Sequence, residues 1–431
     1  MEKRKNVLIY PGNGCNALEV FKCLKYSLRY KPILGNNGYT YGEYLTEDCY
    51  TNLDRVYDPM FVSKLNAFID EKNIKFIIPT HDTVCEEMMK NKAAIKAHIV
   101  CSSYETAHIC RHKKLTYQVL SDLFFLPKVY VDYEGIASTE YPVFAKDEIG
   151  QGGKNTFIAK NYYELLVGLQ NMPETDYVVV EYLPGDEITI DCFTDREGKL
   201  RFWQARERVS ILDGMSEVAR TVQKDKEIEK ICRSINERIQ FRGYWFIQCK
   251  RDRYGNYKLM EISTRFSGTF CVSGNLDVNL PLLALTDAED MDITVFPNKY
   301  DITSARGYEV RYKLDLSYST VYFDFDDTLV FDRKYYNPIA FAFLLQCKNE
   351  GKRVLLITRH CFPINETLKS LHIDKRLFDE IISIPREMKK SEFINDADGI
   401  LIDNSFSDRL DVKEKYGMPA FDICSLDALL K

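Results

Sequence analysis

A predicted hairpin in the second half of the chain carries two side chains that suit a divalent metal ion. Its two strands, residues 244–250 and 257–263, are joined by a short connection that contains a glycine. If the hairpin is symmetric about the Tyr254–Gly255 bond, Gln248 lies directly opposite Glu261. The sequence therefore predicts an amide oxygen and a carboxylate facing each other across the ladder.

Ser263 and Arg265 extend this group. Side chains two apart in a strand share a face, so Ser263 joins Glu261, and Arg265 follows where the chain leaves the strand. Two opposed oxygen ligands with a cationic side chain just beyond suit Mg²⁺, which completes its coordination with phosphate oxygens and water. The alternative is an ordinary exposed hairpin face with a Gln–Glu pair.

Three apolar strands near the C-terminus each end in residues that could do chemistry. One runs into Asp324-Phe-Asp326, a second ends at Thr358, and a third ends at Asp403. With helices between them, these strand ends gather at one edge of a parallel sheet, where ligands of such sheets bind. A solitary Asp-x-Asp also occurs in ordinary loops, but Asp403 in the matching context favours a catalytic site.

The N-terminal hundred residues alternate strands and helices. We expect strands at 6–10, 32–34 and 76–79, and apolar residues at helical spacing over 17–28 and 61–69. This alternation predicts a parallel sheet covered by helices. We therefore expect the chain to begin with an α/β domain.

The carboxyl ends of these strands carry Gly12, Gly14, His81 and Asp82. Ligands of parallel sheets bind at such ends. The two glycines lack the third glycine of a dinucleotide fingerprint, so a tight turn opening a helix is the simpler interpretation. His81 and Asp82 either contact a substrate or cap the following helix.

After residue 140 the pattern of predicted strands and helices changes from α/β to α+β. A strand over 141–146 ends at Lys146, and three glycines within residues 150–153 make a flap whose backbone amides can fold over phosphates. Strands at 177–181 and 187–191 then favour an antiparallel, half-exposed sheet. Isoleucines at helical spacing over 228–239 predict one amphipathic helix that packs on a core.

Composition limits the classes of function. The chain has 431 residues with 58 Lys and Arg against 64 Asp and Glu, a net charge of −6, so no overall positive charge attracts nucleic acid or an anionic membrane. Its 13 scattered cysteines contain no Cys-x-x-Cys pair, which favours reduced thiols in a cytoplasmic protein. We expect neither a secretory signal nor a membrane-spanning segment.

Residues 1–315 resemble the ATP-grasp superfamily, especially its carbamoyl-phosphate-synthetase-like and carboxylate–amine ligase branches. The resemblance implies a parallel α/β pre-ATP-grasp domain over residues 1–105. A two-lobed α+β ATP-grasp domain over residues 106–316 would then clamp ATP between its lobes.

The resemblance also implies residue roles. For nucleotide binding these are the lysines Lys114 and Lys146, the flap glycines Gly150, Gly152 and Gly153, the adenine-holding segment Glu181, Tyr182 and Leu183, and the ribose-binding Glu187. For the metal and the transferred phosphate they are Gln248, Glu261 and Ser263 as ligands, with Arg265 steadying the phosphate. The family usually has asparagine where this chain has Ser263, whose shorter reach weakens a second metal site.

Arg208, in an Arg206-x-Arg208 pair that precedes Gly214, resembles the family's acceptor-side arginines. Surface ion pairs are the alternative. In such enzymes ATP phosphorylates a carboxylate and an amine then displaces the phosphate, which requires neutralisation of phosphate charge and exclusion of water rather than a protein nucleophile.

Residues 318–431 resemble the haloacid dehalogenase-like phosphatases, which implies a Rossmann-like domain. By this resemblance Asp324 is the nucleophile and Asp326 the acid/base. Thr358 would bind phosphoryl oxygens, and Lys390, with Lys389 as the other candidate, would neutralise charge.

The same resemblance implies that Asp324, the backbone carbonyl of Asp326, and Asp403 hold Mg²⁺. Asn404 stands where the family often has a second acid, and Asp408 is the substitute. The short spacing between these motifs leaves no room for a sizeable cap domain, so we expect a capless, open site.

Together these features predict a bifunctional enzyme that uses ATP and Mg²⁺. An ADP-forming ligase would join a small-molecule carboxylate to an amine, and the phosphatase would act on a phosphorylated metabolite. Two alternatives remain: an ATP-grasp small-molecule kinase joined to a phosphatase, and a phosphatase with a regulatory nucleotide-binding module.

Overall fold

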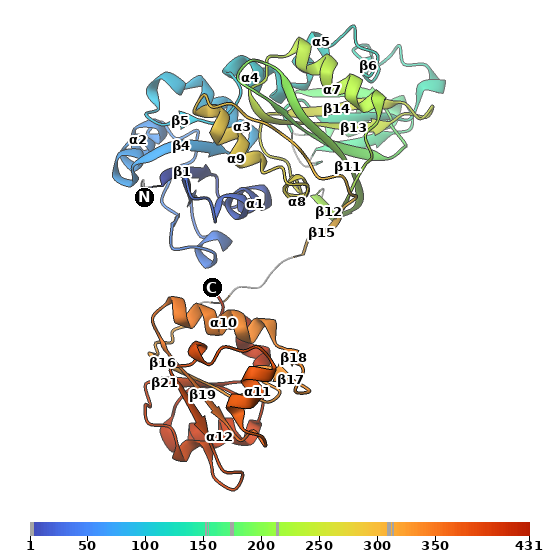
Figure 1. Ribbon diagram of the computed structural model, residues 1–431. Coiled ribbons are helices and arrows are strands. Elements are labelled where there is room, and N and C mark those ends of the chain that lie inside the picture. Colours follow the sequence, from blue (N-terminus) through green and yellow to red (C-terminus); the bar gives the residue numbers. More distant parts are fainter. Residues whose placement is uncertain are drawn as a thin grey trace. The chain divides into compact units, whose positions relative to one another are not determined.

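In the computed structural model, the first hundred residues form a five-stranded parallel sheet in the order β3-β2-β1-β4-β5, with helices packed against it (Figure 1). The structure describes residues 4–150, 153, 155–172, 176–212, 215–307, 312 and 314–431. The elements of this region are β1 (Lys5–Tyr10), α1 (Cys15–Leu24), β2 (Tyr30–Gly35), β3 (Cys49–Tyr50), α2 (Phe61–Lys72), β4 (Ile74–Pro79), α3 (Asp82–Lys90) and β5 (His98–Ile99). The predicted strands and the parallel sheet are confirmed.

One helix is shorter than its apolar spacing suggests. α1 ends at Leu24, and Leu28, the last residue of the predicted stripe, is 89% exposed. The Ser27 hydroxyl accepts hydrogen bonds from the backbone N–H groups of Arg29 and Tyr30, which turns the chain into β2. A local side-chain hydrogen bond of this kind competes with continuation of a helix.

The middle of the chain contains two antiparallel sheets. One has four strands in the order β6-β9-β7-β8, and the other has six in the order β14-β13-β10-β11-β12-β15. The four-stranded sheet and its helices comprise α4 (Tyr104–Arg111), α5 (Lys113–Val119), β6 (Val129–Tyr130), β7 (Val143–Asp147), β8 (Thr156–Ala159), α6 (Tyr162–Gln170) and β9 (Tyr177–Glu181). The six-stranded sheet and its helices comprise β10 (Glu187–Thr194), β11 (Leu200–Leu212), β12 (Met215–Thr221), α7 (Lys226–Arg238), β13 (Gly243–Arg251), β14 (Tyr257–Ser263), α8 (Val272–Asn275), α9 (Leu280–Ala288) and β15 (Thr303–Ala305).

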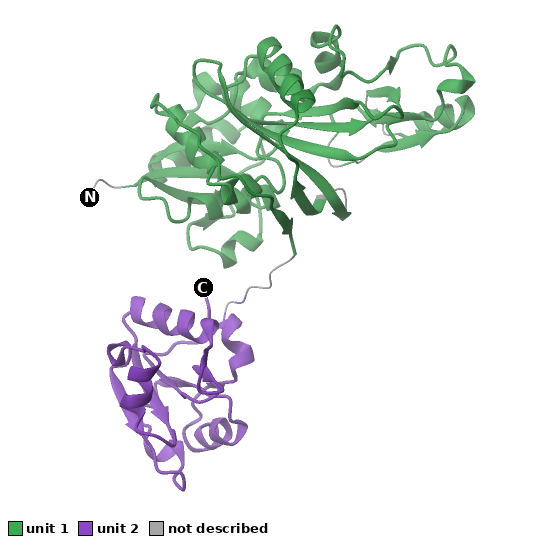
Figure 2. Cartoon of the chain, turned by 45° about the vertical axis from the view of Figure 1, so that its right-hand side comes forward, with its two compact units in different colours: residues 1–308 green, residues 309–431 purple. Residues whose placement is uncertain are grey.

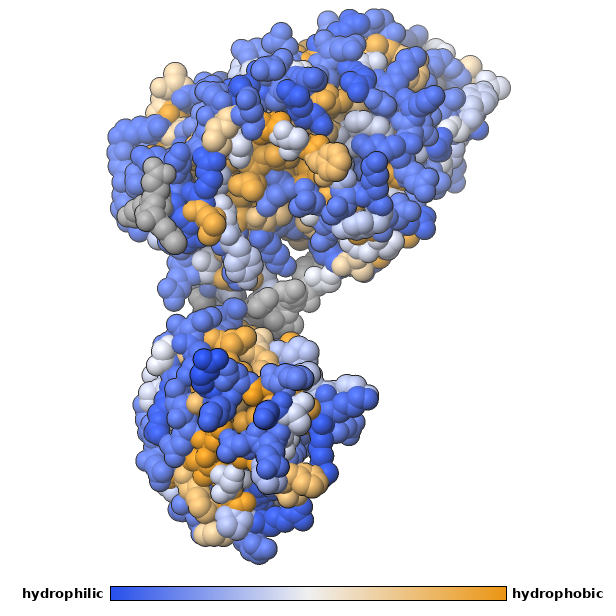
Figure 3. Space-filling model, in the orientation of Figure 1, coloured by the Kyte–Doolittle hydropathy of each residue, from blue (hydrophilic) through white to orange (hydrophobic). Residues whose placement is uncertain are grey.

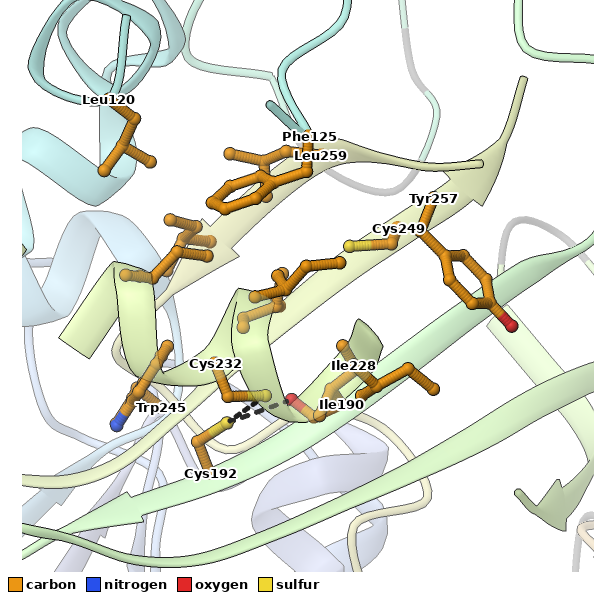
Figure 4. Close-up of a cluster of buried hydrophobic side chains, with 14 of the residues drawn as sticks. Leu120, Phe125, Ile190, Cys192, Ile228, Cys232, Trp245, Cys249, Tyr257 and Leu259 are labelled. Carbon is orange, nitrogen blue, oxygen red and sulfur yellow. Dashed lines mark hydrogen bonds between the residues drawn. The ribbon is translucent and has the colours of Figure 1, made fainter. Parts of the chain in front are cut away.

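The largest core of this region lies between α7 and one face of the six-stranded sheet. Ile228, Ile231 and Ile235 of α7 are buried with the alternate residues of the strands beneath them, among them Ile190 and Trp245. Figure 4 labels Ile228, Ile190 and Trp245 in this core. Because strand side chains alternate between faces, this apolar face leaves the intervening polar residues on the opposite side. The core thereby positions the polar face described below.

The chain divides into two compact units, residues 1–308 and 309–431 (Figure 2). Unit 1 keeps the N-terminal sheet and the antiparallel sheets together, because one core contains side chains from both, such as Ile78 of β4 and Phe246 of β13. The predicted ranges 1–105, 106–316 and 318–431 stay predictions, and the boundary at 105/106 falls inside unit 1.

Unit 2 contains a five-stranded parallel sheet in the order β20-β19-β16-β21-β22. The first strand in sequence lies at the centre, as in doubly wound sheets. Its elements are β16 (Thr320–Phe323), β17 (Val330–Phe331), β18 (Tyr335–Tyr336), α10 (Pro338–Asn349), β19 (Arg353–Thr358), α11 (Ile364–Ser370), β20 (Glu380–Ser383), β21 (Gly399–Ile402), α12 (Phe406–Tyr416) and β22 (Ala420–Phe421). The fold class expected for the whole chain, a mixture of parallel and antiparallel α/β parts, is confirmed at this level.

Hydrophilic residues cover most of the face that Figure 3 shows on each unit. Among the described residues, no helix is long and apolar enough to cross a membrane.

Candidate functional site

A cavity of about 890 Å³ in unit 1 lies over the polar face of the six-stranded sheet. The ladder places Glu261 of β14, Gln248 of β13, Thr189 of β10 and Arg206 of β11 in one row across four neighbouring strands. All four side chains line the cavity. The predicted cross-strand pair of Gln248 and Glu261 is confirmed.

The reason for that pairing differs from the prediction. Next to the turn, Arg251 pairs with Tyr257 and Cys249 with Leu259, so the hairpin is centred on Tyr254 and not on the Tyr254–Gly255 bond. Met260 then forms a β-bulge that shifts the register by one residue, and the shift brings Glu261 opposite Gln248.

The carbonyl of Met260, the bulged residue, binds two side chains of the cavity wall and its surroundings. This carbonyl accepts hydrogen bonds from the Lys146 ammonium at 2.8 Å and from the Tyr117 hydroxyl at 3.2 Å. Lys146 also donates to the Tyr117 hydroxyl at 2.8 Å. The lysine at the end of β7 is therefore fixed beside Glu261 by an irregularity in β14.

Burial sets the charge balance of this group. Burial lowers the pKa of Lys146 to about 8, and the nearby Glu261 carboxylate limits the fall. Burial raises the pKa of Glu261, against the opposing effects of Lys113 and Arg265. The cavity wall thus holds lysines and a carboxylate, and a bound group of opposite charge would stabilise the charged form of each.

Lys113, and not the predicted Lys114, lines the cavity. The Lys113 ammonium donates to the backbone carbonyls of Glu148 and Gly150, and burial lowers its pKa. The Lys114 ammonium lies 2.6 Å from Asp176, and both side chains are largely exposed. The helical spacing could have identified the inward lysine, because Lys113 shares its face with the buried Thr116, Tyr117 and Leu120.

Part of the predicted glycine flap lines the cavity, whereas the predicted adenine-holding segment does not. Gly150 and Gly153 line the cavity, whereas Gly152 lies outside the described residues. Glu181, Tyr182 and Leu183 are not among the described residues that line it. The Glu181 carboxylate instead accepts a hydrogen bond from the backbone N–H of Lys128.

Two arginines of β11 form ion pairs in the cavity wall. Arg208 pairs with Glu187, and both side chains line the cavity. Arg206 is 1% exposed and forms an ion pair at 2.9 Å with the buried Asp191. The alternative of surface ion pairs is therefore wrong for Arg206, and Gly214 lies outside the described residues.

Ser263 does not join Gln248 and Glu261 on the cavity wall. Its hydroxyl donates a hydrogen bond to Asp82, the first residue of α3, which also accepts one from the Arg265 guanidinium at 2.8 Å. Although burial opposes it, this guanidinium holds the pKa of Asp82 below its usual range. The strand pattern could not reveal this pairing, because Asp82 comes from a distant part of the chain.

The N-terminal sheet supplies a further part of the cavity wall. Gly14, at the start of α1, and His81, at the end of β4, line the cavity, as expected from the carboxyl ends of the parallel strands. Asn16 links this sheet to the segment after β14, because its amide donates to the carbonyls of Thr80 and Phe266 at 2.8 and 2.9 Å.

A second group of charged residues lies at the carboxyl edge of the parallel sheet in unit 2. The Lys390 ammonium donates to Asp324 and to Asp403, each at 2.6 Å, and all three side chains are buried. Burial, and then the nearby Asp403, raises the pKa of Asp324 to about 6, while Lys390 acts in the opposite direction. The expected convergence of Asp324 and Asp403 is therefore present.

The sequence left two lysines as candidates, and the structure distinguishes them. Lys389 forms an ion pair with Asp411 on the surface, so Lys390 is the lysine that faces the carboxylates. Asp408 lies 3.9 Å from Lys390 and forms an ion pair with Arg359.

His360 lies at the same sheet edge and was not predicted from the sequence. Its imidazole contacts both carboxylate oxygens of Asp326 at 2.9 Å, its other ring nitrogen contacts Thr367 at 2.9 Å, and its backbone N–H donates to the hydroxyl of Thr358. Its position in the sequence could have indicated it, because it follows the end of β19 by two residues and so lies at the sheet edge that carries Asp324 and Asp403.

The comparisons with known proteins identify the fold of unit 1. Residues 173–312 match the family model described as "ATP-grasp in the biosynthetic pathway with Ter operon". The biotin carboxylase domain of the Hydrogenobacter thermophilus 2-oxoglutarate carboxylase is 15% identical, with a TM-score of 0.58 over 71% of this chain and 75% of that one. Biotin carboxylase from Campylobacter jejuni is 16% identical, with a TM-score of 0.57 over 70% and 76%.

N5-carboxyaminoimidazole synthetase from Staphylococcus aureus is 13% identical, with a TM-score of 0.55 over 69% of this chain and 80% of that one. The search of curated protein sequences gave no significant match. Together the family model and these structures show an ATP-grasp domain in this chain.

Proposed function

We propose that unit 1 is an ATP-dependent, ADP-forming carboxylate–amine ligase and that unit 2 is a Mg²⁺-dependent phosphatase. The observation that carries the first part is the placement of Gln248, Glu261 and Lys146 around one cavity. These are an oxygen pair for a hard cation and a buried cation for a phosphate, the two requirements of phosphoryl transfer from ATP.

Ligands of the similar structures support ATP and Mg²⁺ as the cofactors. The Hydrogenobacter thermophilus domain was solved with MgADP, ADP and bicarbonate, and the Staphylococcus aureus synthetase with ADP. In this chain the amide oxygen of Gln248 and the carboxylate of Glu261 fit Mg²⁺, because both are oxygen ligands on neighbouring strands. The bound ion would neutralise phosphate charge.

The chain's own residues then divide the remaining tasks. Lys146 and Lys113 attract the phosphates, and the flap that contains Gly150 and Gly153 covers them and excludes water. We retain Glu187 as a contact for ribose and replace Lys114 by Lys113. Ser263 is left out of the ligand set because its hydroxyl serves Asp82.

The proposed reaction has two steps. A carboxylate oxygen of the substrate attacks the terminal phosphorus of ATP, which breaks the bond to ADP and gives an acyl phosphate. An amine then attacks the acyl carbon, and phosphate leaves. We assign Arg265 to the transferred phosphate and Arg208 to the acceptor side, since both line the cavity.

For unit 2 we propose that Asp324 attacks the phosphorus of a phosphorylated metabolite. Asp326 then protonates the leaving oxygen and later activates water. Asp403, the Asp324 carboxylate and the Asp326 carbonyl fit Mg²⁺, while Lys390 and Thr358 would contact the phosphoryl oxygens. The geometric support is the convergence of Lys390 on both carboxylates.

The chain's thiols support the proposed cytoplasmic location. The 13 cysteines are thiols rather than disulfides, which suits a reducing compartment.

The ligase proposal is tested by measuring ADP release from ATP and Mg²⁺ with mixtures of small acids and amines. The full-length Asp324→Asn protein removes the proposed phosphatase from the assay, and Glu261→Gln in that background serves as the inactive control. We expect ADP release only when an acid and an amine are both present. A stable phosphorylated product would identify a kinase, and ATP binding without turnover under every mixture would identify a regulatory module.

A further inference from the structure

Three metal-binding side chains meet in unit 1 outside the cavity. Glu86 of α3, His108 of α4 and His112, between α4 and α5, each offer one ligand atom, and these atoms all lie within 4.8 Å of one another. The side chains are 14%, 36% and 28% exposed, so an ion from solvent can reach them. None of the three is among the residues that line the nucleotide cavity.

The helices bring the two histidines together. His108 and His112 are four residues apart, which places them on one helical face, and their ring centroids lie 4.3 Å apart. The backbone N–H of His112 still donates to the His108 carbonyl, which keeps this spacing at the end of α4. α3 packs against α4 and supplies Glu86 from the other side.

Glu148 orients His112. Its carboxylate contacts Nδ1 of His112 at 3.0 Å, while Nε2 of the same ring lies 3.6 Å from Oε1 of Glu86. The Glu148 side chain is buried, and its second oxygen accepts a hydrogen bond from the backbone N–H of Lys114. A carboxylate that holds the far nitrogen of a histidine is the usual support of a metal-binding imidazole.

We propose that Glu86, His108 and His112 form a binding site for Zn²⁺ or a similar divalent transition metal, with water completing the coordination. Two imidazoles and one carboxylate suit Zn²⁺, Co²⁺ or Ni²⁺, whereas Mg²⁺ prefers oxygen ligands alone. Ligands about 2.0–2.1 Å from a tetrahedral ion lie roughly 3.4 Å apart. The 3.6 Å between Glu86 and His112 is close to this spacing.

The contact between His108 and Glu86 must open slightly when the ion binds. Nδ1 of His108 lies 2.5 Å from Oε1 of Glu86, and the ion replaces the proton between them. Arg111 lies 3.7 Å from the other oxygen of Glu86, so it neutralises that oxygen and leaves Oε1 to the metal. The bound ion would join α3 to the end of α4 and thereby stabilise unit 1.

The test uses the full-length protein, freed of metal with a chelator and then titrated with Zn²⁺ alone, without nucleotide. At a free Zn²⁺ concentration 100-fold above Kd we expect the melting temperature to rise by about 5 °C. Co²⁺ should give the visible absorption band of a tetrahedral site with nitrogen ligands. Because neither measurement involves ATP, the result is independent of the proposed ligase function.

Two variants and a control make the assignment specific. His108→Ala with His112→Ala, and separately Glu86→Gln, which preserves the side-chain shape, should each lose the thermal shift and the cobalt band. His98→Gln, an exposed histidine in β5, should retain both. The proposal is overturned if the wild-type protein binds neither metal, or if the variants bind as well as it does, since other side chains would then be the ligands.

Discussion

At the scale of residues, the charge of Lys146 depends on its surroundings. This lysine lies in a buried position, donates to the Met260 carbonyl and to Tyr117, and has its pKa lowered to about 8 by burial. The strand ending in lysine before a glycine-rich flap could be predicted from the sequence. Its hydrogen bond to the Met260 carbonyl could not, because that carbonyl lies on a bulge in a strand more than a hundred residues later.

The lowered pKa predicts a pH dependence of ATP binding. The charged form of Lys146 attracts phosphate, and in the free protein this form is lost as the pH rises through about 8. We therefore expect the Kd for MgATP, measured by calorimetry, to increase about tenfold from pH 7 to pH 9. Lys146→Arg keeps its charge over this range, so its Kd should rise less, and the remaining rise would come from Lys113, whose pKa burial also lowers. Equal slopes for both proteins would contradict this role of Lys146.

At the scale of elements, the start of α5 decides which of two adjacent lysines faces the cavity. Lys113 lies on the same helical face as the buried Tyr117 and Leu120, and Lys114 points to Asp176 on the surface. The family resemblance selected Lys114, whereas the helical periodicity selects Lys113. Local spacing was the better guide here because it reports which face of a helix is buried.

This placement gives a matched pair of variants. Lys113→Ala should raise the KM for ATP about tenfold or more, because it removes a charged contact to phosphate. Lys114→Ala removes only an exposed ion pair and should change the KM less than twofold. Steady-state ADP release in the Asp324→Asn background measures both, and a larger effect from Lys114 would reverse the assignment.

The α7 helix and its buried face were predictable because its isoleucines repeat at helical spacing, although the last of them, Ile239, lies just beyond the helix. Ile231 is completely buried against the six-stranded sheet. Ile231→Ala should lower the free energy of unfolding by about 2–5 kcal/mol, since it leaves a cavity in a packed core. Glu237→Ala, on the exposed face, should change it by less than about 0.5 kcal/mol in the same urea titration; similar effects would show that α7 is not anchored by this stripe.

At the scale of the whole molecule, each unit carries its own group of charged residues. The cavity of unit 1 is lined by residues from Gly14 to Arg306, and the Asp324, Lys390 and Asp403 group belongs to unit 2. Strand ends and turn glycines in the sequence indicated both groups. The pairing of Ser263 with Asp82 joins distant segments and has no local signal, so it could be found only from the fold. The pairing of His360 with Asp326 had one weak signal, because both residues follow strand ends at the same sheet edge.

The proposed function predicts two separable activities, one for each unit. Asp324→Asn should abolish hydrolysis of a small phosphoester such as p-nitrophenyl phosphate and leave ADP formation within about twofold of wild type. Lys146→Ala should reduce ADP formation by about 10²–10³ and leave the hydrolysis unchanged. Loss of both activities in either folded variant would show that the two reactions depend on one site.

We propose that the sheet face of unit 1 holds the phosphates of ATP through a metal ion, and a crystal structure with bound nucleotide is the sharpest test of this proposal. A crystal structure of the full-length protein with Mg²⁺ and a non-hydrolysable ATP analogue should place an ion in contact with the side-chain oxygens of Gln248 and Glu261, with Lys146 beside the phosphates. Nucleotide bound elsewhere, or an ion that neither side chain touches, would contradict the account.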